Sequence, residues 1–117
     1  MRYMLLIYSN EAEWAARSRD ERAAIFADFA HLDEDLKRAG KYRTSDPLEP
    51  TTTATTIRVR AGKTLVTDGP FAETKEHLGG YYLVGARDLD DAISIAARIP
   101  AALHGSVEIR PVVEVER

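Results

Sequence analysis

Two short segments of this sequence are apolar at every position, and they limit the fold more than any other feature. Residues 3–8 read Tyr-Met-Leu-Leu-Ile-Tyr, and residues 81–84 read Tyr-Tyr-Leu-Val. Successive side chains of a strand point to opposite faces of a sheet, so a strand that is apolar at both parities is buried on both faces. The two segments therefore predict a sheet that is covered front and back.

Two helices are predicted to flank these strands. The first begins with Ser18 and Glu21, which have the spacing of a capping box, and ends at Gly40, the residue type favoured just past a helix end. A second helix spans residues 89–99, with an aspartate before it as a cap and a proline after it. The first helix has an apolar stripe spaced by four, three and four positions, which predicts the side that faces the core: Ile25, Phe29, Leu32 and Leu36.

The rest of the chain predicts a hairpin and a last strand. Residues 41–56 contain two prolines and a threonine-rich stretch, which we interpret as an irregular connection. In residues 57–60 apolar and basic side chains alternate, Ala61-Gly62 is typical of a tight turn, and residues 63–68 return as the second hairpin strand. A final alternating segment predicts a strand over residues 106–115.

The order strand, helix, hairpin, strand, helix, strand predicts an α+β fold. With one hairpin strand set aside, it is the split βαβ order of ferredoxin-like folds, carrying an inserted β-hairpin. No repeat or linker divides the chain, so residues 1–117 are expected to form one domain. Two helices cover only one face of such a sheet, and a second copy packed sheet to sheet would cover the other. The alternative is that long side chains and the 41–56 connection fold over that face.

Composition excludes several classes of protein. The chain has 117 residues, 44% of them hydrophobic and 30% charged, which excludes a disordered or fibrous protein. It has no cysteine, which excludes disulfides and thiolate chemistry. The net charge is −3 with no basic tract, so neither nucleic acid nor an anionic membrane is an expected partner. No apolar run reaches the roughly 18 residues of a membrane span, and we expect a cytoplasmic protein.

A longer motif carries a resemblance to a known family. Residues 66–76 read Val-Thr-Asp-Gly-Pro-Phe-Ala-Glu-Thr-Lys-Glu and are followed by Gly-Gly-Tyr-Tyr at 79–82. This motif resembles the DGPF-motif branch of the YCII-related family, as do the opening residues 1–8, the segment 53–56 and the ending 105–111. The resemblance implies a dimeric α+β barrel of ferredoxin-like subunits. It does not imply one reaction, because the wider family includes a chloromuconolactone dehalogenase and the superfamily includes muconolactone isomerases.

The same resemblance implies a catalytic His–Asp pair. In simpler family members a histidine precedes a Leu-x-x-x-Leu helix that ends in glycine, a pattern similar to His31 and the residues that follow it, and the counterpart aspartate is Asp68. The residues alone leave alternatives open. His31 lies about 120° around its helix from the apolar stripe, so it is either a cleft imidazole or half of a surface ion pair with Asp28 or Asp35. Asp68 is either a fixed carboxylate at a strand end or the first residue of an Asx-type turn.

Three residues are candidates for substrate binding. Arg58 shares a strand face with Arg60 and can clamp an anion, although charges on a hairpin also prevent edge pairing. Lys75 can bind an anionic group or be a solvated loop charge. Tyr82 can present its hydroxyl to a dimer cavity or pack between subunits. The histidines are isolated from one another in sequence and thiolates are absent, so no metal is expected, although scattered carboxylates leave a hard-metal site open. Gly79-Gly80 precedes a strand rather than a helix, so it is not a phosphate-binding loop, and no cofactor is expected.

Two functional hypotheses follow, and the sequence does not decide whether the protein is an enzyme. The first is a homodimer that performs cofactor-free proton transfer of a lyase, isomerase or dehalogenase type on a small anionic molecule. His31 would shuttle the proton, Asp68 would hold its tautomer, and Arg58 or Lys75 would bind the anionic end. The alternative is a non-catalytic module that binds a metabolite or a protein, and by family association it is accessory to an extracytoplasmic-function sigma factor.

Overall fold

A four-stranded antiparallel sheet forms the centre of the protein in a computed structural model that describes residues 1–115. The order across the sheet is β2 (Tyr42–Pro47), β5 (His77–Gly85), β1 (Arg2–Ser9) and β6 (Ser106–Pro111). The two segments that are apolar at both parities, in β1 and β5, are the central pair, as their composition requires. This arrangement of antiparallel strands and few helices confirms the predicted α+β class and is consistent with a ferredoxin-like fold.

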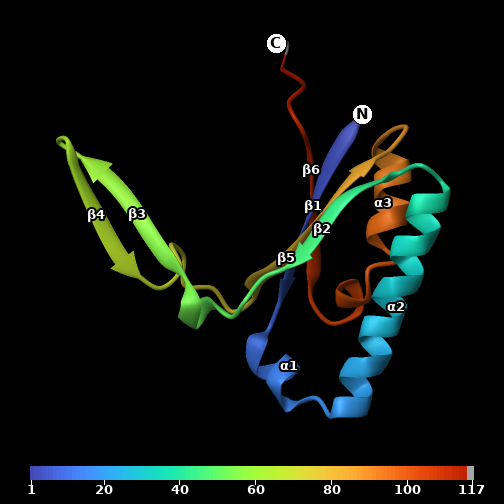
Figure 1. Cartoon of the computed structure of the whole chain (residues 1–117), viewed down its shortest axis with the longest axis horizontal. Coiled ribbons are helices and arrows are strands. Elements are labelled where there is room, and N and C mark those ends of the chain that lie inside the picture. The colour runs from blue at the N-terminus through green and yellow to red at the C-terminus, as the bar shows by residue number, and fades with distance from the viewer. Residues whose placement is uncertain (116–117) are drawn as a thin grey trace.

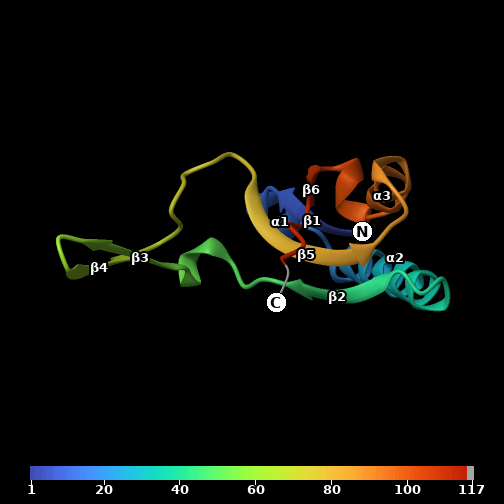
Figure 2. The ribbon, with the colours of Figure 1, turned by 90° about the horizontal axis from the view of Figure 1, so that it is seen from above.

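The two main helices pack on the same face of this sheet. Figure 1 shows the sheet nearly edge-on, with α2 (Arg19–Arg38) and α3 (Leu89–Ala96) on one side of it, and Figure 2 shows the same separation from above. Shorter helices complete the chain: α1 (Glu11–Ala16), η1 (Thr51–Thr53) and η2 (Pro100–Leu103). The core lies between this sheet face and the two helices, and its most deeply buried large side chains are Leu5, Leu32, Val84 and Ile99.

The predicted local signals of α2 are confirmed, whereas α3, expected to run to residue 99, ends at Ala96, before the separate turn η2 that begins at Pro100. Ser18 and Glu21 form the capping box, with both reciprocal hydrogen bonds at 3.1 Å. Gly40 has a φ of 71°, a left-handed conformation that glycine adopts without strain, and this ends α2. On the predicted stripe of α2, Leu32 and Leu36 are buried in the core. The final strand, expected to run to residue 115, ends at Pro111.

The connection after α2 differs from the prediction. Residues 41–56 are not irregular throughout, because Tyr42–Pro47 pairs with β5 as the edge strand β2. The sequence does not indicate this strand, because only Tyr42 reaches the core and an edge strand with little buried surface needs no apolar alternation. Its closing proline is typical of an edge strand, since proline cannot donate to a central ladder.

The hairpin is confirmed, but neither of its strands belongs to the central sheet. β3 (Thr55–Arg60) and β4 (Lys63–Asp68) form a separate two-stranded sheet, which we call the arm. Its turn is the predicted Ala61-Gly62 pair, with φ values of 50° and 74°. In both Figure 1 and Figure 2 the arm extends from the sheet on the side opposite to α2 and α3.

The second face of the central sheet is apolar at its middle. Met4 and Leu6 of β1 and Leu83 of β5 have the opposite parity to the core residues, and all three are half-buried. Within residues 1–115 no helix lies over this face, which we call the open face (Figure 2). Residues 42–47 of the 41–56 connection do not fold over it, because they extend the sheet sideways as its edge strand.

Candidate functional site

Polar side chains gather at one end of the sheet, where β1 finishes and β5 and β6 begin. The register pairs Ser9 with His77 and Tyr8 with Ser106, so the segments before and after these positions meet there. Gly105 permits this meeting, because a Cβ atom at this position would lie 2.1 Å from the carbonyl oxygen of Tyr8. Only glycine allows so close an approach of two backbones.

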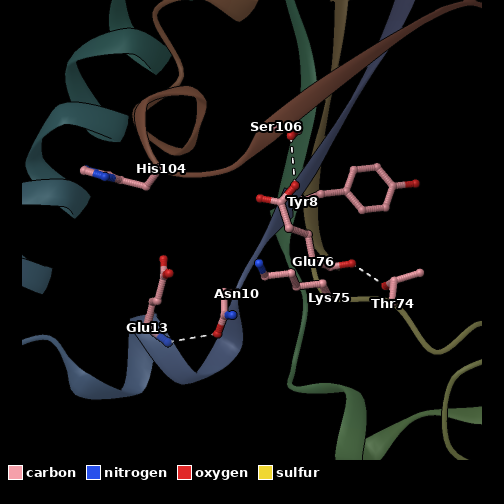
Figure 3. Close-up of a pocket in the computed structure, with 8 residues that line it drawn as sticks. All are labelled: Tyr8, Asn10, Glu13, Thr74, Lys75, Glu76, His104 and Ser106. Carbon is pink, nitrogen blue, oxygen red and sulfur yellow. Dashed lines mark hydrogen bonds between the residues drawn. The ribbon is translucent and has the colours of Figure 1, made fainter.

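A groove of about 640 Å³ opens at this end of the sheet (Figure 3). It is lined by residues from the end of β1, from α1, from the loop before β5 and from the start of β6: Tyr8, Asn10, Glu13, Thr74, Lys75, Glu76, His104 and Ser106. The lining combines two carboxylates, one ammonium group and one imidazole. Groups of this kind can bind a small polar molecule and exchange protons with it.

The carboxylate of Glu76 is held in place within the groove. Ser106 donates a hydrogen bond from Oγ to Glu76 Oε1 at 2.9 Å, and Thr74 donates from its hydroxyl to the Glu76 carbonyl oxygen (Figure 3). The side chain of Asn10 is occupied as the cap of α1, where its Oδ1 accepts the N–H of Glu13 at 3.1 Å. Glu76 therefore supplies a carboxylate that is held in place in the groove. Lys75, its neighbour in the chain, supplies the positive charge of the groove.

A histidine–carboxylate pair lies at the same end of the sheet, next to the groove in sequence. The Nδ1 atom of His77 is 3.4 Å from Oε1 of Glu11, within ion-pair distance. Nδ1 is shielded from solvent and makes no hydrogen bond within the described part of the chain. The His77 side chain as a whole is 28% exposed, so its accessible surface lies on atoms other than Nδ1.

Thr51 fixes the Glu11 carboxylate from its other side. The Thr51 hydroxyl donates to Glu11 Oε1 at 2.6 Å, and the Thr51 backbone N–H lies 3.2 Å from each carboxylate oxygen. A carboxylate that is oriented in this way can hold a neighbouring imidazole in one orientation and accept the proton on its nearer nitrogen. The farther nitrogen is then left to act on a ligand, which is the arrangement of a general acid or base supported by a second group.

The two residues predicted as a catalytic pair are placed on different elements. His31 is exposed on α2, and Asp68 is exposed at the end of β4 in the arm. The central sheet lies between α2 and the arm in both overall views (Figures 1 and 2). One chain therefore does not bring His31 and Asp68 together, and their catalytic role stays a prediction.

The predicted substrate-binding residues also occupy different places. Lys75 lines the groove. Arg58 lies in the arm, with its guanidinium 5.0 Å from the centre of the Phe71 ring. Tyr82 is buried under the helices, where its ring stacks on Phe29 and its hydroxyl donates to Asp33. Burial, together with this hydrogen bond, raises the pKa of Tyr82 above its ordinary value.

The tyrosine on the open face is Tyr81 rather than Tyr82. Its hydroxyl donates to Asp46 Oδ2 at 2.6 Å, across the register pair of β5 and β2. The hydrogen bond to Asp46 raises the pKa of Tyr81. A ligand that binds the Tyr82 hydroxyl would have to displace Asp33. The tyrosine hydroxyl at the open face is that of Tyr81.

Sequence reasoning missed Glu11 and the pairing of His77 with it. Glu11 is separated by 40 positions from Thr51, which holds it, so no local motif links the two. The sequence signal that could have indicated a site at His77 was its position, between the end of a charged loop and the start of an apolar strand.

Two further findings describe residues 1–115. No group of three or more histidine and carboxylate side chains among them is placed to hold a metal ion. No helix in the described part of the chain is long and apolar enough to cross a membrane.

Comparisons with known proteins match nearly the whole chain to a family. The family model described as the YCII-related domain matches residues 1–116. A protein of Rhizobium meliloti (strain 1021), which carries the description uncharacterized, is 41% identical over 113 residues, covering 95% of this chain and 91% of that protein.

Proposed function

The chain belongs to the YCII-related family, and on that premise we propose that it binds a small anionic molecule at the end of the sheet and transfers a proton there without a cofactor. The reaction class that the family resemblance supports is that of a lyase, an isomerase or a dehalogenase. The working protein in this proposal is a homodimer.

The observation that carries this proposal is the His77–Glu11 pair. The shielded Nδ1 of His77 lies 3.4 Å from a carboxylate that Thr51 already orients. General acid–base catalysis needs an imidazole whose ring is held and whose other nitrogen reaches the ligand. In this proposal Glu11 holds the ring by accepting the Nδ1 proton, and the other nitrogen acts on the ligand. His77 is therefore the proposed proton carrier, and Glu11 is its positioning residue.

The anion is proposed to bind beside this pair. Lys75 supplies a positive charge in the groove, and the fixed Glu76 supplies a second carboxylate one residue before His77. A volume of about 640 Å³ is in the range that small-molecule sites have. A small carboxylate or lactone-like molecule fits the size of the groove, and because Glu13 and Glu76 are both acidic, its anionic end is proposed to bind at Lys75.

The pair His31 and Asp68 is a second route to the same chemistry. Because one chain keeps these residues on opposite sides of its sheet, a shared site would need His31 of one copy and Asp68 of the other. Arg58 lies in the same arm as Asp68 and would accompany it as an anion-binding residue. This route therefore depends on the homodimer.

The open face supports the homodimer. Met4, Leu6 and Leu83 lie on it without a covering helix in the described chain, and a second sheet packed against it would remove them from water. Light scattering at micromolar concentration is expected to give twice the mass of 13.0 kDa. A monomer would exclude this assembly.

A non-catalytic module is the second candidate function. The observation that favours it is the arm, which exposes apolar side chains and extends away from the central sheet (Figure 1). Such a module would bind a metabolite or a protein, with an extracytoplasmic-function sigma factor as the partner that family association suggests. Co-purification of a sigma factor with the chain, together with no ligand effect at the groove, would support this candidate over the enzymatic one.

The experiment that tests the proposed function is a thermal-shift screen of small carboxylates and lactones. Wild type is compared with His77→Gln and Glu11→Gln, and the matched control is Glu34→Gln, which makes the same change to an exposed carboxylate on α2. We expect ligands that raise the wild-type melting temperature to have no effect on the first two variants. Equal shifts in all the proteins would contradict the assigned pair, and His31→Ala with Asp68→Asn tests the second route in the same screen.

A further inference from the structure

We propose that the arm, residues 55–68, binds a second copy of this chain. The inference rests on the homodimer in the proposed function and adds to it a contact that the open faces alone do not supply. It concerns how the two copies hold each other, and it does not depend on the His77–Glu11 pair.

The arm lacks the packing that a hairpin needs. Among residues 1–115 its two strands pair only with each other, from Thr55 opposite Asp68 to Arg60 opposite Lys63. An isolated two-stranded hairpin is marginally stable in water, and both of its edges are open to pairing. The structure holds this hairpin extended, so a surface outside the chain is needed to cover it.

One face of the arm carries three apolar side chains at its middle, between the Thr55–Asp68 pair and the turn. Ile57 is opposite Val66, and Val59 lies on the same face two positions along the strand. These three side chains are 62%, 63% and 58% exposed, in that order, although valine and isoleucine are usually buried. A contiguous exposed apolar face of this kind marks an interaction surface.

The other face of the arm is basic, and its charge complements the remainder of the chain. Arg58, Arg60 and Lys63 share this face. Because Asp68 is the only acidic residue in the arm, the net charge of the arm is +2. The whole chain carries −3, which leaves −5 on the rest. A second copy of the chain therefore presents a body of opposite charge to the arm.

The position of the arm also favours a second copy. The arm extends on the side of the open face, with the sheet between it and the helices (Figures 1 and 2). A copy that covers the open face lies on the same side as the arm, and two-fold symmetry gives it the same contact in return. The arm would then carry Arg58 and Asp68 to the other copy. Within one chain, His31 lies next to neither of these residues.

The test measures the dissociation constant of the dimer by sedimentation velocity over a dilution series. The arm variant is Ile57→Ser with Val66→Ser, and the matched control is Leu103→Ser with Val113→Ser, two residues that are 80% and 79% exposed outside the arm. We expect the arm variant to raise the dissociation constant by at least about tenfold, since this corresponds to roughly 1.4 kcal/mol of lost apolar contact. The control pair is expected to leave it unchanged.

Hydrogen exchange on the wild-type protein provides a second measurement that needs no variant. Backbone amides of β3 and β4 are expected to exchange slowly in the dimer and fast after dilution below the dissociation constant. If the arm variant leaves the dissociation constant unchanged and dilution leaves the amide exchange of the arm unchanged, the arm's role is overturned while the open-face dimer stays intact. A monomeric wild type would overturn the arm and the dimer together, and the ligand screen with His77→Gln would still report separately on the groove.

Discussion

Lys41 donates a hydrogen bond from Nζ to Oδ1 of Asp91 at 2.8 Å, and this contact ties the segment before β2 to the first turn of α3. Asp91 is buried, and its second oxygen accepts the backbone N–H of Arg87 at 3.0 Å. These two donors lower the pKa of Asp91 to about 2, from an ordinary value of 3.8. The pair fixes the helix layer against the sheet edge, far from the proposed site.

The first prediction is the pH dependence that this pair gives to stability. Because the folded pKa of Asp91 lies below its ordinary value, its ionised form stabilises the fold at pH values above about 4, and this contribution is lost as the pH falls toward about 2. Asp91→Asn is expected to lower the melting temperature at pH 7 and to remove part of the fall between pH 4 and pH 2. Asp90→Asn, an exposed neighbour in the same turn, is the control. Identical acid profiles for wild type and Asp91→Asn would contradict the prediction.

The second prediction concerns Tyr82 as a core residue. Tyr82→Phe keeps the ring that stacks on Phe29 and removes the hydroxyl that donates to Asp33. Leaving a half-buried carboxylate without this donor is expected to cost about 1–2 kcal/mol in the free energy of unfolding, measured by urea denaturation. Tyr81→Phe, which removes a hydroxyl at the open face, is expected to cost less in the same assay. A variant Tyr82→Phe with unchanged stability but lost ligand binding would instead support a substrate-binding role.

The third prediction concerns the backbone approach at Gly105. A methyl group at this position would be 2.1 Å from the Tyr8 carbonyl, so Gly105→Ala must move the turn that leads into β6. We expect a loss of about 1–3 kcal/mol in the free energy of unfolding and a weaker Ser106–Glu76 contact in the groove. Gly79→Ala is the matched control, since its nearest contact would be an ordinary 3.6 Å to Ser9 Oγ. Equal stability of the two variants would show that the turn relaxes freely.

The fourth prediction concerns the support that Thr51 gives to Glu11. Thr51→Val removes the hydroxyl that donates at 2.6 Å and keeps the backbone N–H contact. We expect ligand binding at the groove to weaken while the melting temperature falls only slightly, because one partly exposed hydrogen bond contributes about 1 kcal/mol. Thr53→Val in the same short helix is the control, as its hydroxyl bonds the Pro50 carbonyl instead. Equal ligand affinity in both variants would contradict a positioning role for Thr51.

Much of the fold could be predicted from the sequence because its signals are local. The two central strands are apolar at both parities, the capping box of α2 joins residues three positions apart, and the arm turns at Ala61-Gly62 as predicted. β2 escaped prediction because an edge strand buries little surface and so has no apolar pattern. The arm was predicted as a hairpin, but its position outside the central sheet depends on which strand occupies the edge beside β5, a contact that no local pattern encodes.

The candidate site was harder to predict for the same reason. Lys75 was placed correctly in a charged loop, and the structure adds the groove around it. The His77–Glu11 pair joins the first residue of α1 to the first residue of β5, and only the fold brings these together. His31 and Asp68 show the reverse case: each has a suitable local setting, yet the sheet separates their elements.

The tautomer of His77 decides whether Glu11 orients its imidazole, and NMR reads it from the nitrogen chemical shifts of the ring in wild type and in Glu11→Leu. We predict that neutral His77 carries its proton on Nδ1 in the wild type, facing the Glu11 carboxylate, and that the variant loses this preference. His31, which is on a separate helix, should give the same spectrum in both proteins. A proton on Nε2 of His77 in the wild type, unchanged by the substitution, would contradict the pair and the proposed site with it.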